Sequence, residues 1–190
     1  SKALLNWWFN TEHIVPKSDG TMSEFKYYYA QREAIETVIY LYEVAQVKDK
    51  YDLIKYDSSG AVSTGMFDED WLRLVLKMAT GSGKTKVMSL IITWCYFHKT
   101  YEEDSKLSTN FLLIAPNIIV LDRLRSDFDG LNIFWRDPLL PDNGYEGYQW
   151  QDDFQLTTHI QDDVSIIRKP GHLCLTNIHR VFASTDSDVS

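Results

Sequence analysis

The residues with the clearest capacity for chemistry lie in the short stretch TGSGKT, residues 80–85. The stretch separates a short apolar run from a longer, almost uniformly apolar one. If a strand enters it and a helix leaves it, unpaired backbone N–H groups and the positive end of the helix dipole point at one place. Gly81 and Gly83 permit the backbone angles that such a concave nest of amides requires. This pattern predicts a phosphate-binding loop.

Side chains in the same stretch extend this prediction to a magnesium nucleotide. Lys84 supplies an ammonium group for β- and γ-phosphates, and we expect it to act in catalysis, while the Thr85 hydroxyl is placed to bind Mg²⁺. The full pattern GxxxxGK[ST] begins with glycine, where this chain has Met78, but backbone contacts from Gly81 onward do not depend on that position. The loop residues predicted to bind ATP are Thr80, Gly81, Ser82, Gly83, Lys84 and Thr85.

The hydrophobic pattern around the loop predicts alternating strands and helices. Apolar residues at helical spacing, or in runs too long for a strand, predict helices over 28–47, 84–98 and 118–128. Short apolar runs bounded by turn residues predict strands over 72–77, 111–115, 154–160, 164–168 and 172–176. The turn-rich stretch 137–150 reads as a long loop. This alternation is typical of an α/β fold built around a largely parallel sheet.

The composition is that of a globular domain. The chain has 190 residues, of which 44% are hydrophobic, and no run is long enough to predict a membrane span. A net charge of −8 argues mildly against a basic face that grips nucleic acid, although backbone N–H groups and neutral side chains can also hold phosphates. Cys95 and Cys174 lie in apolar segments without metal-binding spacing, which favours reduced, buried thiols and a cytoplasmic location.

Several stretches, in this order, resemble a known family. MATGSGKT resembles motif I of superfamily 2 helicases and translocases, and within them the Res subunits of type III restriction enzymes and related DEAD/DEAH-type proteins. YYYAQREAIE resembles the segment in which a glutamine of the family reads adenine, and Gln31 matches that glutamine. FLLIAPNIIVLDRL resembles motif Ia and CLTNIHR resembles motif Ib, which contact a nucleic-acid backbone in the family. The residues that the resemblance assigns to nucleic acid are Pro116, Asn117, Thr176 and Asn177.

The resemblance implies a P-loop NTPase with a RecA-like lobe, its sheet flanked by helices, over residues 25–190, preceded by an N-terminal extension over residues 1–24. It implies ATP and Mg²⁺ as cofactors, DNA as a partner, and a modification or specificity subunit as a further partner. The implied activity is that of an ATP-dependent DNA translocase or helicase, the motor subunit of a restriction endonuclease.

Hydrolysis in such enzymes requires an apolar strand that ends in Asp-Glu, whose carboxylates hold Mg²⁺ and position water. The acidic clusters at 68–70, 152–153 and 162–163 lack that setting. The second lobe is absent as well, so we expect an N-terminal piece of a longer protein. We expect this piece to bind ATP weakly and not to turn it over.

Other classes of function remain open. A P-loop kinase for small molecules would need its phosphate loop near the start and an arginine-bearing lid, whereas about eighty residues precede the loop here. A nucleotide-binding scaffold that signals without turnover is the other alternative. The scattered histidines form no metal or catalytic spacing, and NWWF near the start reads as an apolar patch that docks on the domain or on a missing partner segment.

Overall fold

The computed structural model describes residues 1–190 except 18, 61–62, 64, 66–71, 162–170 and 182–190. The chain forms two compact units, which are described separately. One consists of Ser1–Lys26 and Met88–Ser190, and the other of Tyr27–Val87. The predicted division into an extension over 1–24 and a lobe over 25–190 stays a prediction.

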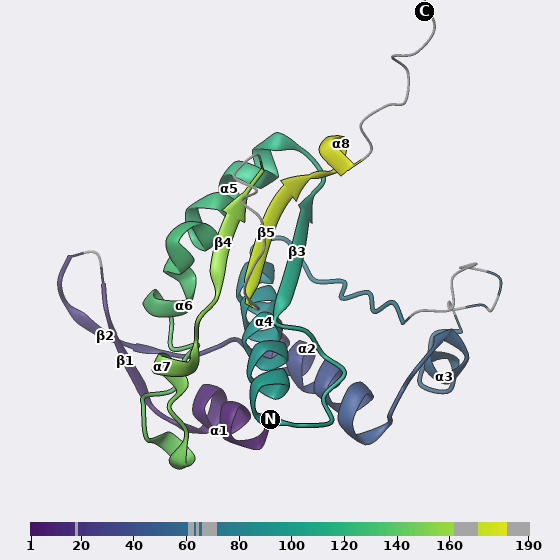
Figure 1. Ribbon diagram of the computed structural model, residues 1–190, viewed down its shortest axis with the longest axis horizontal. Coiled ribbons are helices and arrows are strands. Elements are labelled where there is room, and N and C mark those ends of the chain that lie inside the picture. The colour runs from purple at the N-terminus through teal and green to yellow at the C-terminus, as the bar shows by residue number, and fades with distance from the viewer. Residues whose placement is uncertain (18, 61–62, 64, 66–71, 162–170, 182–190) are drawn as a thin grey trace, which may run out of the picture. The chain divides into compact units, whose positions relative to one another are not determined.

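The larger unit is built on a parallel sheet of three strands in the order β3-β5-β4. The strands are β3 (Asn110–Ala115), β4 (Thr157–Ile160) and β5 (His172–Asn177). β5 lies between the other two, and both of its pairings are parallel (Figure 1). The α/β class and the parallel sheet predicted from the sequence are thus confirmed. The predicted strand over 164–168 lies outside the described residues.

Helix α5 (Ile118–Phe128) covers one face of this sheet. Its Leu121 packs with Ala115, Ile160 and Leu175, one buried side chain from each strand. Burying apolar area in this way is the main term that stabilises a helix on a sheet. The helix has the bounds that the sequence predicts.

Helix α4 (Lys84–Tyr101) follows the predicted phosphate loop and runs three residues beyond its predicted end. Its last turns belong to the larger unit, where Phe97 packs edge-on against Trp150 with ring centroids 4.9 Å apart. Trp150 opens the short helix α7 (Trp150–Asp153). Elements that complete this region are the 3₁₀ turns η2 (Asp129–Leu131) and η3 (Tyr145–Gly147) and the helices α6 (Asn132–Arg136) and α8 (Ile178–Val181).

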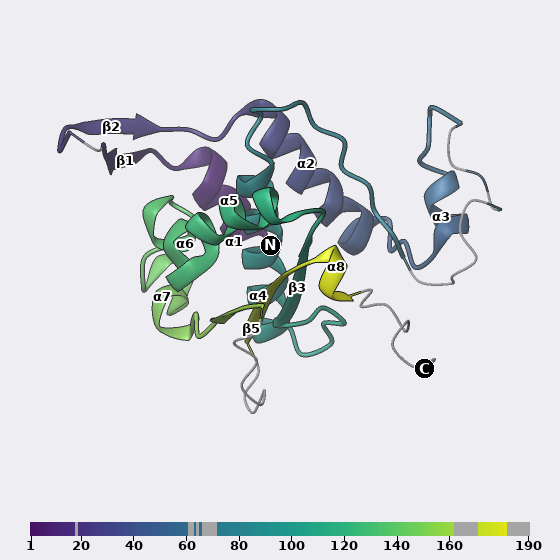
Figure 2. The same cartoon turned by 90° about the horizontal axis from the view of Figure 1, so that it is seen from above.

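The N-terminal residues form α1 (Lys2–Asn10) and the hairpin of β1 (His13–Pro16) and β2 (Met22–Phe25) (Figure 2). Trp8 of α1 is 2% exposed, and its Nε1 donates to the carbonyl oxygen of Leu139 at 2.9 Å. Trp7 Nε1 donates to the carbonyl oxygen of Pro138 at 3.1 Å. The prediction that NWWF docks on the domain is confirmed.

The smaller unit contains α2 (Tyr29–Ile39), the π-helical turn η1 (Tyr40–Val44) and α3 (Lys50–Ile54). The single helix predicted over 28–47 therefore changes its winding at Tyr40. The strand predicted over 72–77 is wrong: residues 72–79 have no regular secondary structure, and Val75 is 82% exposed. A strand needs a neighbour for its hydrogen bonds, and the described part of Tyr27–Val87 contains no other strand.

The helices of the described ranges include none that is both long enough and apolar enough to cross a lipid bilayer.

Candidate nucleotide and nucleic-acid sites

The loop at residues 80–83 has the backbone shape that the sequence predicts for a phosphate nest. Gly81 and Gly83 have φ angles of +82° and +80°, values that side chains other than glycine rarely adopt. α4 begins immediately afterwards at Lys84, and the first N–H groups of a helix have no partner within the helix. The loop therefore places backbone amides next to the positive end of α4, an arrangement that favours binding of an anion.

The side chains of the loop converge on one carbonyl oxygen. Lys84 Nζ donates to the carbonyl oxygen of Ala79 at 2.9 Å, and Ser82 Oγ donates to the same atom at 2.7 Å. Lys84 is exposed, so its ammonium group can leave this carbonyl without disturbing a packed core. A phosphate oxygen in the loop would compete with Ala79 for the ammonium.

Gln31 is tied to the loop in a way that the sequence analysis missed. Its side chain is 1% exposed; Nε2 donates to the carbonyl oxygen of Ser82 at 3.0 Å, and Oε1 accepts from the backbone N–H of Tyr28 at 2.9 Å. The second bond is the capping contact of a glutamine three residues after the start of a helix. The spacing from Tyr28 to Gln31 could have indicated this cap, but not the bond to Ser82. A carboxamide keeps one N–H and one lone pair after these two bonds, so the adenine contact predicted for Gln31 stays a prediction.

The residues of the loop fit a phosphate group better than they fit a metal ion. For phosphate they offer backbone amides, two left-handed glycines and the Lys84 ammonium. For Mg²⁺ they offer neutral hydroxyls and no carboxylate, and the hydroxyl predicted to bind it is that of Thr85 in the first turn of α4. No group of three or more His, Cys, Asp or Glu side chains suited to a metal is found among the described residues. A bound Mg²⁺ would need further oxygens, such as those of the nucleotide itself.

The residues predicted to contact nucleic acid come together at the carboxyl edge of the sheet. Ala115 at the end of β3 is in register with Asn177 at the end of β5, so Pro116 and Asn117 leave the sheet beside Asn177. Thr176 lies one residue earlier, in register with Ile114. Figure 1 shows β5 running into α8 at this edge, next to the end of β3.

Both asparagines at this edge cap the helices that follow. Asn117 Oδ1 accepts from the backbone N–H of Val120 at 2.9 Å, and Asn177 Oδ1 accepts from that of Arg180 at 3.2 Å. Asparagine is a favoured N-cap because its oxygen satisfies one of the unpaired amides. The Asn117 cap fixes the start of α5 at this edge, where Pro116 and Asn117 are exposed. The remaining N–H groups at such a helix start can donate hydrogen bonds to phosphate oxygens.

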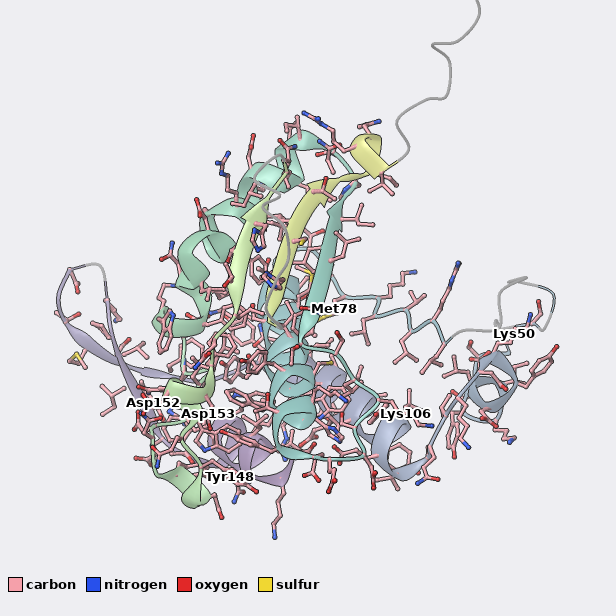
Figure 3. The ribbon with its side chains drawn as sticks, in the orientation of Figure 1. Lys50, Met78, Lys106, Tyr148, Asp152 and Asp153 are labelled. Carbon is pink, nitrogen blue, oxygen red and sulfur yellow. The ribbon has the colours of Figure 1, made fainter. Side chains whose placement is uncertain are left out.

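The acidic pair at 152–153 has a structural role. Asp153 accepts from the Tyr101 hydroxyl at 2.8 Å, and its backbone carbonyl accepts from the Tyr96 hydroxyl at 2.9 Å. Burial, aided by the bond to Asp153, raises the pKa of the Tyr101 hydroxyl. Figure 3 labels Asp152 and Asp153 on α7 and Tyr148 just before it. Asp153 thus joins α7 to the end of α4, and the pair does not end an apolar strand. The clusters at 68–70 and 162–163 fall outside the described residues.

Comparison with known proteins identifies one family. The sequence model of the family described as "Type III restriction enzyme, res subunit" matches residues 24–188. The match covers most of the chain, and it begins after α1 and β1. No curated protein and no solved structure matches the chain.

Proposed function

Because the chain belongs to the family of type III restriction enzyme res subunits, we propose that it is the ATP-binding part of an ATP-dependent DNA translocase or helicase. Its fold is the P-loop, RecA-like α/β fold of that family, as the sequence predicts. The observation that carries the proposal is the loop at residues 80–83, with two left-handed glycines directly before the 18-residue helix α4. The family favours a motor over a small-molecule kinase.

In this proposal the loop holds the phosphates of ATP. The amides of Gly81 to Lys84 bind phosphate oxygens, and the side chains of Thr80 and Ser82 line the approach. Lys84 exchanges the carbonyl oxygen of Ala79 for the β- and γ-phosphates and stabilises the charge that develops during phosphoryl transfer. The Thr85 hydroxyl would hold Mg²⁺, which would supply positive charge to offset that of the phosphates. Gln31 holds the loop through Ser82 and contacts adenine with its remaining N–H and lone pair.

The carboxyl edge of the sheet is the proposed contact with DNA. Pro116 and Asn117 are exposed, whereas Thr176 is half-buried and Asn177 is only 8% exposed. In this proposal the four residues offer mainly backbone groups and the Asn117 amide, which suit the sugar-phosphate backbone better than base edges. Neutral contacts of this kind fit a chain whose net charge is −8. They fix the position of a strand and leave sequence recognition to another part of the enzyme, for which a modification or specificity subunit is the proposed partner. DNA as the substrate agrees with a cytoplasmic location.

Turnover requires groups that we place elsewhere in the enzyme. The Asp-Glu pair that positions water and the arginine of a second lobe complete the site in such motors. We therefore propose that the 190-residue chain binds Mg-ATP and does not hydrolyse it.

The experiment is a titration of the chain with a fluorescent ATP analogue in Mg²⁺. We expect Lys84→Ala to weaken binding at least about tenfold, equal to ~1.4 kcal/mol, with an unchanged melting temperature because Lys84 is exposed. The matched control is Lys48→Ala, which removes an exposed ammonium of the same unit outside the loop. Equal affinity in the wild type and Lys84→Ala would refute the assignment of the ATP site. Robust hydrolysis by the chain alone would refute the separate proposal that it does not turn ATP over.

A further inference from the structure

A groove of about 400 Å³ lies between β1 and the segment from α6 to residue 142. We propose that this groove, named here the hairpin groove, binds an extended, positively charged segment of a protein partner, which adds as a third strand to the hairpin. The proposal is independent of ATP binding and of the DNA edge.

The two walls of the hairpin groove are fixed to each other. His13 Nε2 at the start of β1 donates to the carbonyl oxygen of Trp7 at 2.6 Å, and the two rings lie 4.8 Å apart. Trp7 in turn donates from Nε1 to the carbonyl oxygen of Pro138 on the opposite wall. The groove is therefore formed before a partner arrives, which lowers the entropic cost of binding.

Each wall exposes a large apolar side chain. Ile14 of β1 is 65% exposed and Trp135 of α6 is 53% exposed, and both line the groove. Buried Leu140 and half-buried Pro138 continue the apolar surface between them. An aromatic residue in a concave apolar surface is the usual anchor of a protein interface.

The outer edge of β1 has free hydrogen-bonding groups. At the hairpin turn, Lys17 N–H donates to the carbonyl oxygen of Thr21. In an antiparallel ladder, every second residue pair is hydrogen-bonded across the two strands, so the pairs alternate along β1 from this point. Val15 and His13 consequently bond to β2, whereas the backbone of Ile14 points to the other edge. Pro16 also faces that edge but has no N–H. The groove is lined by β1 and by no residue of β2. An extended peptide in the groove can therefore form hydrogen bonds with the backbone of Ile14 and add a strand to the hairpin.

The charged residues of the hairpin groove favour a positively charged occupant. Glu12 and Asp142 are exposed carboxylates at its rim. The guanidinium of Arg136 lies 3.1 Å from Asp127 and 3.4 Å from Asp137, so this cation is already engaged. The groove repels nucleic-acid phosphates and favours lysine or arginine on the incoming segment.

Half of the groove lies outside the family match, which begins at residue 24. The wall formed by residues 12–16 precedes the matched region, while the wall at 134–142 lies within it.

The test selects random dodecapeptides displayed on phage against the purified chain, with counter-selection on an Ile14→Asp/Trp135→Ala double variant. We expect enriched peptides with apolar residues at alternate positions and with lysine or arginine. A synthetic consensus peptide should bind at least tenfold more weakly to each single variant, Ile14→Asp and Trp135→Ala. N-methylation of its residue opposite Ile14 should weaken binding to a similar degree, and binding should fall as salt is raised. Val44→Asp, a substitution at another exposed apolar side chain, is the matched control and should bind normally.

Three results would overturn the proposal. The first is that no peptide discriminates the wild type from the double variant. The second is that the enriched peptides are acidic or bind equally after N-methylation. The third is that light scattering shows a dimer of the chain that Ile14→Asp dissociates, because a second copy would then occupy the groove.

Discussion

Gln31 donates a hydrogen bond from Nε2 to the carbonyl oxygen of Ser82 at 3.0 Å, and this bond joins the first turn of α2 to the phosphate loop. The next residue, Gly83, leaves no room for a side chain, because a Cβ there would collide with the Gln31 amide. The shape of the loop thus depends on a residue 51 positions earlier in the chain.

We predict that Gln31→Ala destabilises the fold and weakens nucleotide binding together. The substitution leaves the carbonyl of Ser82 and the N–H of Tyr28, both in part-buried hydrogen bonds, without their partner, at a cost of about 1–3 kcal/mol. Urea unfolding measures the stability, and titration with the fluorescent ATP analogue measures the affinity. Gln149→Ala is the matched control, since that glutamine is exposed and makes no side-chain cap bond. A stable Gln31→Ala variant with normal affinity would show that the bond does not hold the loop.

We predict that Asn117→Asp separates helix capping from DNA binding. Aspartate caps as well as asparagine and favours the positive helix end, so stability should be kept or rise slightly. The added charge should repel a DNA phosphate and weaken binding about tenfold, or ~1.4 kcal/mol. Anisotropy of a labelled duplex at low salt measures the affinity.

The charge control for this variant is Ser108→Asp. Ser108 is exposed before β3, at the opposite end of that strand, and its Oγ accepts from the Asn110 N–H as a carboxylate oxygen also can. Equal loss of DNA affinity in both variants would mean that net charge, and not position at the carboxyl edge, controls binding.

We predict that Trp8→Ala unfolds the larger unit more easily, by about 3–5 kcal/mol, because it removes a buried indole and leaves the Leu139 carbonyl unpaired. Urea unfolding followed by circular dichroism measures this loss. Trp135→Ala should cost less than Trp8→Ala, since Trp135 is 53% exposed. A loss below ~1 kcal/mol for Trp8→Ala would mean that α1 is not part of the cooperative unit.

We predict that the thiol of Cys95 reacts slowly in the folded protein. Burial raises its pKa to about 12, and only the thiolate attacks disulfide reagents. In a Cys174→Ala variant, which leaves Cys95 as the single thiol, labelling near about pH 8 should be at least ~100-fold slower than in urea. Similar rates in both conditions would contradict the burial.

The raised pKa of the Cys95 thiol also makes the free energy of unfolding depend on pH. The folded pKa lies above the unfolded one, so the stability present below about pH 8.5 is lost as the pH rises toward 12. Between the two pKa values, the Cys95 thiol loses its proton in the unfolded chain but keeps it in the folded one, which favours unfolding. A Cys95→Ala variant should lose less stability over this range, measured by urea unfolding at each pH.

Elements whose ends carry local signals could be predicted from the sequence. α5 has the predicted bounds because Pro116 ends the strand and Asn117 caps the helix. α2 was predicted too long, because apolar spacing does not show that Ala45 N–H bonds to Tyr40, five residues back. The strand over 72–77 was wrong because its residues have strand composition but no described neighbour to pair with.

The local geometry of the phosphate loop could be predicted in part, whereas the ligands assigned to its residues stay predictions. The glycine angles and the helix start at Lys84 follow from local residue types. The bond from Gln31 to Ser82 and the shared acceptor at Ala79 depend on packing between distant segments, which no local pattern encodes. The hairpin groove was missed for the same reason.

The exposed apolar segment before the phosphate loop has a consequence for handling the isolated chain. A run of Leu74, Val75 and Leu76 in water, with open backbone groups, is a template for cross-β aggregation. Arg73 and Lys77 flank it as charged gatekeepers, which oppose the stacking of neighbouring copies. Solubility at high concentration should therefore depend on these two cations, and high salt, which screens them, should promote precipitation.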